Sequence, residues 1–175
     1  RHILLLNPNA ELLSGTLESM VSFMDDHPRV GAAGCQLLDS DMSQLRSWSG
    51  FPLPFRKRFE NSRIYPKLTR ALLGHNESGA EISRADALGV DSLAGDCMIV
   101  RREAANRVGL LDEHFPPYGC FVDWCIRVRS AGWENFVLSE CKVVLRGNDS
   151  SSLDACADVM NSRRGALRLC RKHYS

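Results

Sequence analysis

The sequence has 175 residues, of which 44% are hydrophobic and 25% are charged, values typical of one globular domain. Its 22 basic and 21 acidic residues give a formal net charge of +1, so the overall charge gives no argument for a nucleic-acid partner or an acidic substrate. No apolar run approaches the roughly 18 residues of a membrane-spanning helix, and residues 3–6 are too short for the apolar region of a signal peptide.

The first 38 residues predict a strand, a helix and a second strand. Residues 3–6 are apolar and end at the turn of residues 7–9, which predicts a short buried strand. Apolar residues recur at helical spacing over residues 12–24, with the helix cap among residues 14–16. Residues 30–38 are apolar and small, as in a closely packed strand. This order predicts a parallel α/β unit, and a chain that opens on a buried strand is expected to be part of a larger fold.

Residues from about 39 to 89 are expected to form an irregular insertion. This segment contains three prolines and the basic run Arg56-Lys57-Arg58, and residues 68–73 predict a short helix. Two interpretations remain open for it. One is a solvated surface loop. The other is a basic loop that contacts a phosphate-bearing lipid or a membrane surface.

Regular structure is predicted again from residue 90. Residues 97–100 predict a buried strand, and residues 102–108 predict a short helix. A second helix is predicted over residues 122–131, because its apolar positions have helical spacing and a glycine follows it. Residues 135–138 and 142–145 predict two further short strands.

The tail predicts one long amphipathic helix over residues 153–174. We therefore divide the chain into a domain of residues 1–150 and a basic C-terminal helix within residues 151–175. Five basic residues lie between 163 and 172: Arg163, Arg164, Arg168, Arg171 and Lys172. They form either a solvated face or a contact with the surface of a membrane.

Cysteines and histidines give no metal site in the sequence. The seven cysteines are scattered without a Cys-x-x-Cys pair, and the five histidines show no paired spacing. An odd number of cysteines within apolar patterns predicts reduced, mostly buried thiols in a cytosolic protein. We therefore assign no metal ligands.

The carboxylates alone do not identify an active site. Asp123 is expected in the first turn of a helix, where it is either a general base or a partner of the helix amides. Asp112 precedes Glu113-His114 and is expected to fix a turn. The sequence contains no Gly-rich phosphate loop and no serine nucleophile elbow.

Taken in chain order, several segments resemble the motifs of family-2 glycosyltransferases. They are LLLNPNA at residues 4–10, VGAAG at 30–34, AGDCMIVRREA at 94–104, VGLLDEHF at 108–115 and VDWCIRVRSAGW at 122–133. The tail RKHY at residues 171–174 is similar to the rhamnosyltransferase-like branch. The resemblance covers most of the chain outside residues 39–89.

The resemblance implies a GT-A fold, which is a Rossmann-like mixed sheet flanked by helices. The N-terminal half that grips the nucleotide finds no match here, so we expect a partial domain. Such enzymes transfer a hexose from a nucleotide-sugar, with inversion, to a glycan or lipid-linked acceptor in cell-surface polysaccharide biosynthesis. They use a divalent cation, Mg²⁺ or Mn²⁺, and a carboxylate base. We expect this chain alone to bind no cofactor, and to be a cytoplasmic protein peripheral at the inner face of the membrane.

The departures from these motifs fall on the positions that carry the chemistry. Asn9 stands where a metal-binding aspartate is expected, and Cys120-Phe121 stands where a Glu-Asp pair supplies the base. Arg146 aligns near an expected histidine and offers a positive charge to a diphosphate. The surviving acid, Asp123, is the candidate catalytic residue. The candidate substrate-binding residues are Asn7, Asn9, Gly95, Asp96 and Arg146.

Three hypotheses follow for the function. The first is a glycosyltransferase-family domain that is incomplete or inactive as this chain, because its base and metal ligands are replaced. The second is a non-catalytic binding or scaffold module on the same fold. The third is a metal-independent transferase that uses Asp123 and Arg146. A partial sheet exposes a strand edge, so self-association is also expected.

Overall fold

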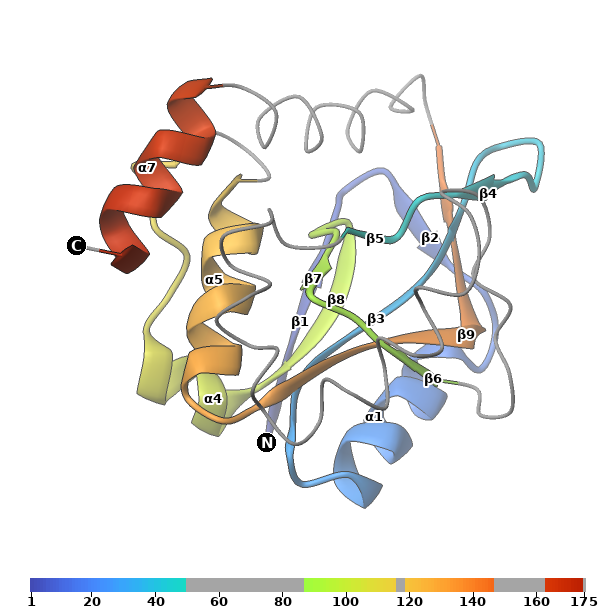
Figure 1. Ribbon diagram of the computed structural model, residues 1–175. Coiled ribbons are helices and arrows are strands. Elements are labelled where there is room, and N and C mark those ends of the chain that lie inside the picture. Colours follow the sequence, from blue (N-terminus) through green and yellow to red (C-terminus); the bar gives the residue numbers. More distant parts are fainter. Residues whose placement is uncertain (50–86, 116–118, 147–162, 175) are drawn as a thin grey trace, which may run out of the picture.

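The computed structural model describes residues 1–49, 87–115, 119–146 and 163–174. These residues form a mixed sheet with helices on both faces (Figure 1), as the resemblance predicted. The short helix predicted near residues 68–73, the basic run at 56–58 and residues 153–162 of the predicted tail helix lie outside the described residues.

The central sheet has the strand order β1-β8-β3-β9-β2. Strands β1 and β3 are both antiparallel to β8, and β3 is parallel to β9, so β1, β3 and β9 run in the same direction. The parallel unit predicted for the first 38 residues is confirmed, with β8 inserted between its two strands. The bounds are β1 His2–Leu6, β2 Ala10–Leu12, β3 Val30–Leu38, β8 Cys97–Arg101 and β9 Glu134–Leu145.

Short strands extend this sheet and form a second one. Strand β4 (Gln44–Leu45) pairs with β3, and β6 (Ala87–Gly89) pairs with β9. Strands β5 (Trp48–Ser49) and β7 (Ser92–Leu93) form a separate two-stranded sheet. The described ends of the segment predicted to be irregular therefore contain strands. Strand β1 ends the described strand order on one side, so self-association through an open edge remains a prediction.

Four helices are described, two of which cover opposite faces of the sheet (Figure 1). Helix α1 (Thr16–Asp26) contributes Met20 and Met24 to one hydrophobic core, and α5 (Gly119–Ser130) contributes Val122 and Ile126 to the other. Because side chains alternate along a strand, the consecutive residues of β3 supply both cores.

The remaining helices are α4 and α7. Helix α4 (Arg102–Val108) has the predicted bounds, whereas α5 begins three residues before the predicted start. The predicted place of Asp123 in the first turn is therefore wrong, because the earlier start of α5 puts this residue beyond that turn. Helix α7 (Arg163–Tyr174) forms the described part of the predicted tail helix and lies beside α5 (Figure 1). No helix within the described ranges is both long and apolar enough to cross a membrane.

The predicted start of the first helix is wrong. Residues Ala10–Leu12 form β2, in which Leu12 pairs with Val143 of β9, and α1 begins at Thr16 after Gly15 in a left-handed conformation. No side chain caps α1; the Thr16 hydroxyl instead donates to the carbonyl of Lys142 at 3.0 Å. The apolar periodicity missed this because β9 offers a free edge to which residues 10–12 add.

The prediction of two separate strands after α5 is also wrong. Strand β9 is continuous, but its register along β3 jumps between Leu138 and Lys142, which leaves residues 139–141 in a bulge. Within the bulge Cys141 is buried and its thiol lies 3.7 Å from the Thr16 carbonyl. Polar Ser139 and Glu140 interrupt the apolar pattern without ending the pairing.

Candidate functional site

Two predicted residues meet where β1 ends and β8 begins. Asn7 follows β1, Asp96 precedes β8, and the pairing of Leu6 with Cys97 makes the two residues neighbours. The Asn7 side-chain amide donates to a carboxylate oxygen of Asp96 at 2.9 Å, and its backbone N–H donates to the Asp96 carbonyl at 2.8 Å. Asp96 is buried. The antiparallel register therefore brings together residues that are 89 positions apart.

The turn after β1 connects this pair to the end of β9. The backbone N–H of Asn9 donates to the side-chain oxygen of Asn7 at 2.9 Å, and the N–H of Arg146 donates to the carbonyl of Asn9 at 2.8 Å. Asn7, Asn9, Asp96 and Arg146 thus form one hydrogen-bonded group, which we call the polar rim. It lies at the carboxyl ends of β1 and β9, which run in the same direction.

Glu11 is a rim residue that the sequence reasoning missed. Its carboxylate accepts a hydrogen bond from the Nε of Arg146 at 2.6 Å, and both side chains are more than half exposed. The hydrogen bond and the charge of Glu11 raise the pKa of Arg146 above its ordinary value. The cation expected to face a diphosphate therefore already has a carboxylate partner. The alternation of apolar and charged residues at positions 10–12 could have identified Glu11, if that segment had been predicted as a strand.

Gly95 borders the polar rim and is covered by an aromatic ring. A Cβ atom built on Gly95 would lie 2.0 Å from Cζ of Phe121 and 2.1 and 2.4 Å from two further ring atoms. Phe121 comes from the first turn of α5 and packs against the core on that face of the sheet. Phe121, which stands in place of the expected base, thus lies directly against Gly95.

Asp123 does not belong to the polar rim. Its side chain is completely buried. The Nε of Arg127 donates to it at 2.9 Å, Lys172 donates at 3.0 Å, and the His173 ring lies 2.8 Å away. Within the described part of the chain its hydrogen-bond partners come from α5 and α7. The arrangement ties the C-terminal helix to the first turns of α5.

The electrostatics of Asp123 suit an anchor better than a general base. Burial raises the pKa of Asp123, but hydrogen bonds from His173 and Lys172 and the charge of Arg127 outweigh it and hold the pKa below its ordinary value. A general base works best with a pKa near the working pH, so a lowered value is the opposite of what this role needs. The catalytic role of Asp123 remains a prediction.

Asp112 extends the same ionic cluster. Lys172 donates to its carboxylate at 2.6 Å while also contacting Asp123, and His114 donates to Asp112 from its backbone at 3.0 Å. The Lys172 hydrogen bond, followed by those of His114, holds the pKa of Asp112 well below its usual range. The predicted turn at Asp112 is confirmed by the bond from the Phe115 N–H to the Asp112 carbonyl.

Arg127 links this cluster to the turn before α5. Its guanidinium donates to the carbonyls of Val108 and Gly109, and to that of Leu110 at 2.8 Å. The Trp124 indole also donates to the Gly109 carbonyl at 2.9 Å. The motif residues at 108–110 and 127 therefore hold α4 and α5 together, which is a structural role.

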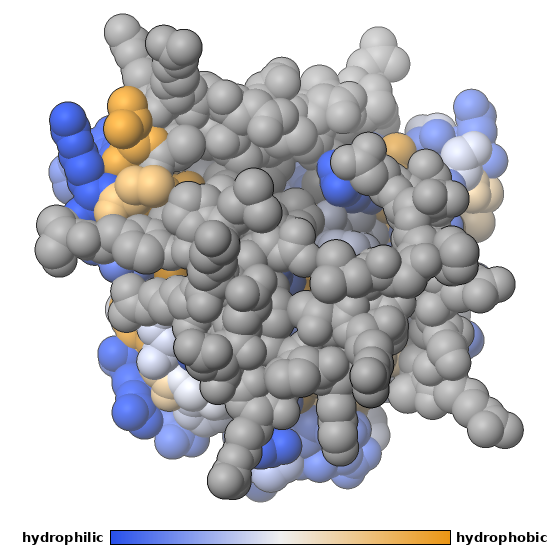
Figure 2. Space-filling view, viewed as in Figure 1, coloured by the Kyte–Doolittle hydropathy of each residue, from blue (hydrophilic) through white to orange (hydrophobic). Residues whose placement is uncertain are grey.

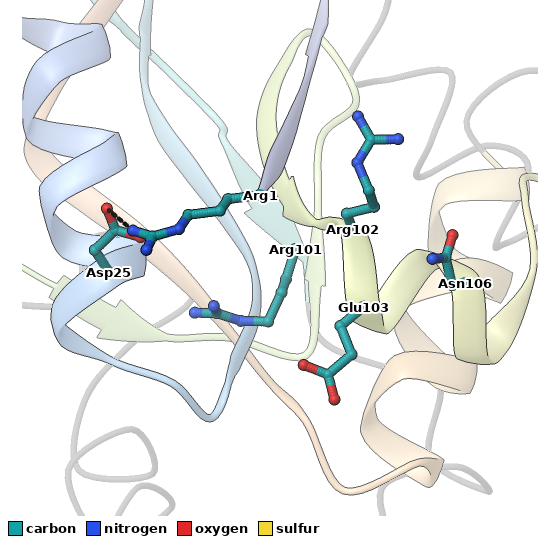
Figure 3. A pocket seen from close by; sticks show the side chains of 6 residues that line it. All are labelled: Arg1, Asp25, Arg101, Arg102, Glu103 and Asn106. Atoms are coloured by element: carbon teal, nitrogen blue, oxygen red, sulfur yellow. Dashed lines mark ion pairs between the residues drawn. The ribbon is translucent and has the colours of Figure 1, made fainter.

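An open pocket lies at the other end of β1 (Figure 3). It is lined by Arg1, Asp25, Arg101, Arg102, Glu103 and Asn106. Arg1 points toward Asp25 at 3.6 Å (Figure 3), while Arg101 donates to the carbonyls of Val30 at 2.8 Å and His27 at 3.0 Å. The charges are mixed, and none of the predicted site residues lines it. We therefore place the candidate site at the polar rim.

The donor set of the rim does not fit a divalent cation. Mg²⁺ and Mn²⁺ prefer several converging oxygen ligands, mainly carboxylates. Asn9 replaces the expected acid, Asp96 accepts from Asn7, and Glu11 accepts from Arg146. Among the described residues, no group of three or more His, Cys, Asp or Glu side chains is placed to hold a metal ion.

Comparison with known proteins gives related sequences and a shared fold. No protein-family model matches the chain. The N-acetylglucosaminyl-diphospho-decaprenol L-rhamnosyltransferase of Mycobacterium tuberculosis, from two strains, is 25% identical over 159 residues, which cover 90% of this chain. They cover 50% of that protein, so the chain spans about half the length of the curated relatives it matches.

A solved structure supports the architecture. The crystal structure of GalNAc-T7 with UDP, GalNAc and Mn²⁺ superposes with a TM-score of 0.54 over 83% of this chain and 27% of that one. The sequences are 11% identical in this superposition, so the likeness shows the fold alone.

Proposed function

We propose that this chain forms the acceptor-side half of a sugar-transfer domain. The proposal starts from its GT-A fold and from its resemblance to the rhamnosyltransferase-like family-2 glycosyltransferases. The curated relatives are L-rhamnosyltransferases. The name of the curated relatives gives an N-acetylglucosaminyl-diphospho-lipid acceptor. We assign the same acceptor class, a lipid-linked diphosphate glycan, to this chain, and a nucleotide-sugar donor to the whole domain.

The polar rim is the observation that carries the proposal. Ligands of α/β sheets bind at the carboxyl ends of the parallel strands, and the rim lies at the ends of β1 and β9. The side-chain amides of Asn7 and Asn9 suit sugar hydroxyls, and the Arg146 guanidinium suits a diphosphate. A diphosphate at the rim competes with Glu11 for Arg146.

We propose that this half binds and does not transfer. Phe121 stands where the base is expected, and loss of a positioned base costs about 10²–10⁴-fold in rate. Asn9 removes a negative charge from the expected metal position. Asp123, the surviving acid, is enclosed by basic side chains. We therefore expect no detectable sugar transfer by this chain alone.

Replacing Arg146 with alanine tests the proposed binding. A charge-assisted hydrogen bond contributes about 1.5–3 kcal/mol, so we expect Arg146→Ala to weaken binding of a short-chain N-acetylglucosaminyl-diphospho-lipid at least about tenfold. Calorimetric titration, with Mn²⁺ and with EDTA, gives the affinity. A metal-independent site predicts equal affinity in both buffers.

The matched control is Arg29→Ala. Arg29 is also exposed and paired with a carboxylate, Glu134 at 3.8 Å, but it precedes β3 at the opposite end of the sheet. We expect this variant to bind like the native chain. Absence of binding by the native chain at millimolar ligand, or equal loss in the two variants, contradicts the proposed function.

A non-catalytic scaffold is the second candidate. The observation that favours it is the neutral character of Asn9 and Phe121 at the two positions that carry the chemistry of related enzymes. Under this alternative the chain binds a glycan or partner and remains inactive even when the upstream half of the domain is supplied. Sugar transfer by a chain extended to the full length of its relatives would eliminate it.

Helix α7 supports a membrane-surface contact. Leu167 is 55% exposed, and the nearby Arg168 and Arg171 are also exposed. Figure 2 shows apolar side chains beside strongly hydrophilic ones at the place of α7. This combination suits an anionic lipid surface. We expect the chain to co-sediment with phosphatidylglycerol vesicles at low salt and to be released at high salt. Equal sedimentation with neutral phosphatidylcholine vesicles contradicts this contact.

A further inference from the structure

The ring of Phe121 fills the space over Gly95. Three ring atoms lie 2.0 to 2.4 Å from the position of a Cβ on residue 95, a separation that real Cβ atoms do not tolerate. They are the atoms at the far end of the ring, Cζ, Cε1 and Cε2. A Cβ would therefore lie over the outer half of the ring, and only a hydrogen on the α-carbon of Gly95 fits against it.

Gly95 is needed for space and not for backbone conformation. The described glycines with positive φ are Gly15, Gly109 and Gly132, and Gly95 is not among them. A residue without a side chain at such a position marks the close approach of another group. At the edge of a ligand site that group is commonly the ligand, whereas here the chain's own phenyl ring takes its place.

The location of Gly95 gives this contact a functional meaning. Gly95 directly precedes Asp96, whose carboxylate binds Asn7 in the polar rim. The base of a transferase must lie within hydrogen-bond reach of the acceptor hydroxyl. By the resemblance Phe121 occupies the position of that base, so the space over Gly95 is where an acceptor sugar would present its hydroxyl.

The ring is held in place by the packing of α5. Phe121 packs against the buried core on its face of the sheet. The helix lies so close to β3 that a Cβ on Gly31 would be 2.6 Å from a methyl carbon of Val128. Asp123, two residues further along, binds α7. These contacts fix α5 between the sheet and α7, so the helix that carries Phe121 has little freedom to move away from Gly95.

We propose that Phe121 is a specificity-determining residue that excludes a sugar ring from the space over Gly95. The chain then holds the diphosphate of its ligand at the polar rim while the sugar hydroxyl stays away from the position of the base. This inference rests on the proposed function and adds the reason why the site binds without transferring.

Nuclear magnetic resonance of the native chain and Phe121→Ala tests the proposal. With free N-acetylglucosamine as the probe, we expect saturable shifts of the Gly95 and Asp96 amides in Phe121→Ala at concentrations at least about tenfold lower than in the native chain. The conservative variant Phe121→Leu, which lacks the outer ring atoms, should fall between the two. Phe115→Ala is the matched control, because it removes a buried phenyl ring elsewhere.

A second measurement keeps the contact testable if the sugar binds weakly. Gly95→Ala should lower the melting temperature of the native chain and leave that of Phe121→Ala unchanged, because the clash requires the ring. Equal sugar shifts in native and Phe121→Ala proteins, or no gain in Phe121→Ala, overturn the proposal. Failure of the proposed function is seen separately: neither the native chain nor Phe121→Ala would then bind the N-acetylglucosaminyl-diphospho-lipid at the polar rim.

Discussion

Asp123→Asn is expected to lower the free energy of unfolding by about 3–5 kcal/mol and to release helix α7, the size of effect seen when one partner of a buried ion pair is removed. The carboxylate is completely buried and is contacted by Arg127, Lys172 and His173. Asparagine keeps the shape of the side chain but removes its charge, which leaves these basic groups facing a neutral amide.

Urea unfolding measures the loss of stability, and hydrogen exchange over residues 163–174 measures the release of α7. Asp112→Asn is the matched control, because it removes another carboxylate that binds Lys172. Its loss should be smaller, since the Asp112 side chain is 24% exposed whereas that of Asp123 is completely buried. A native-like stability of Asp123→Asn with α7 still protected would show that Asp123 is not the anchor.

The same cluster gives the sign of the pH dependence. The pKa of Asp123 is lowered in the folded chain, so its stabilisation is fully present above the ordinary aspartate pKa of about 3.9 and is lost as the pH falls through the lower folded value. We expect Asp123→Asn to lose less stability than the native chain over this acidic range. An identical acid profile for both proteins would contradict this.

Arg101→Ala is expected to lower the free energy of unfolding by about 3 kcal/mol, because several carbonyls lose a charged donor. Arg101 donates to the carbonyls of Val30, His27 and Met24, and its guanidinium lies 5.8 Å from the centre of the Trp133 ring. The side chain thereby ties the end of α1 and the start of β3 to the last residue of β8.

The neighbouring arginine provides the control for this prediction. Arg102 begins α4, is exposed, and lines the same open pocket as Arg101 (Figure 3). We expect Arg102→Ala to change the free energy of unfolding by less than about 0.5 kcal/mol. Thermal and urea unfolding of both variants measure the difference. Similar losses of stability in the two variants would contradict the proposed role of the Arg101 hydrogen bonds.

Local sequence patterns determined several elements of this protein. The apolar residues of β1, β3 and β8 predicted those strands, and the glycine after Val108 predicted the end of α4. The motifs also selected Asn7, Asn9, Asp96 and Arg146, which the structure joins by hydrogen bonds. These predictions succeeded because period, turn chemistry and strand ends are local properties of the chain.

The tertiary structure alone decided which partners these residues have. The enclosure of Asp123 depends on Lys172 and His173, about fifty positions away, and the covering of Gly95 depends on how α5 docks on the sheet. A carboxylate near the start of a helix looks the same in sequence whether it faces a ligand or another helix. Burial and pairing arise from contacts between distant segments, so the sequence indicated the ancestry of the site, and packing determined where Asp123 and Phe121 lie in it.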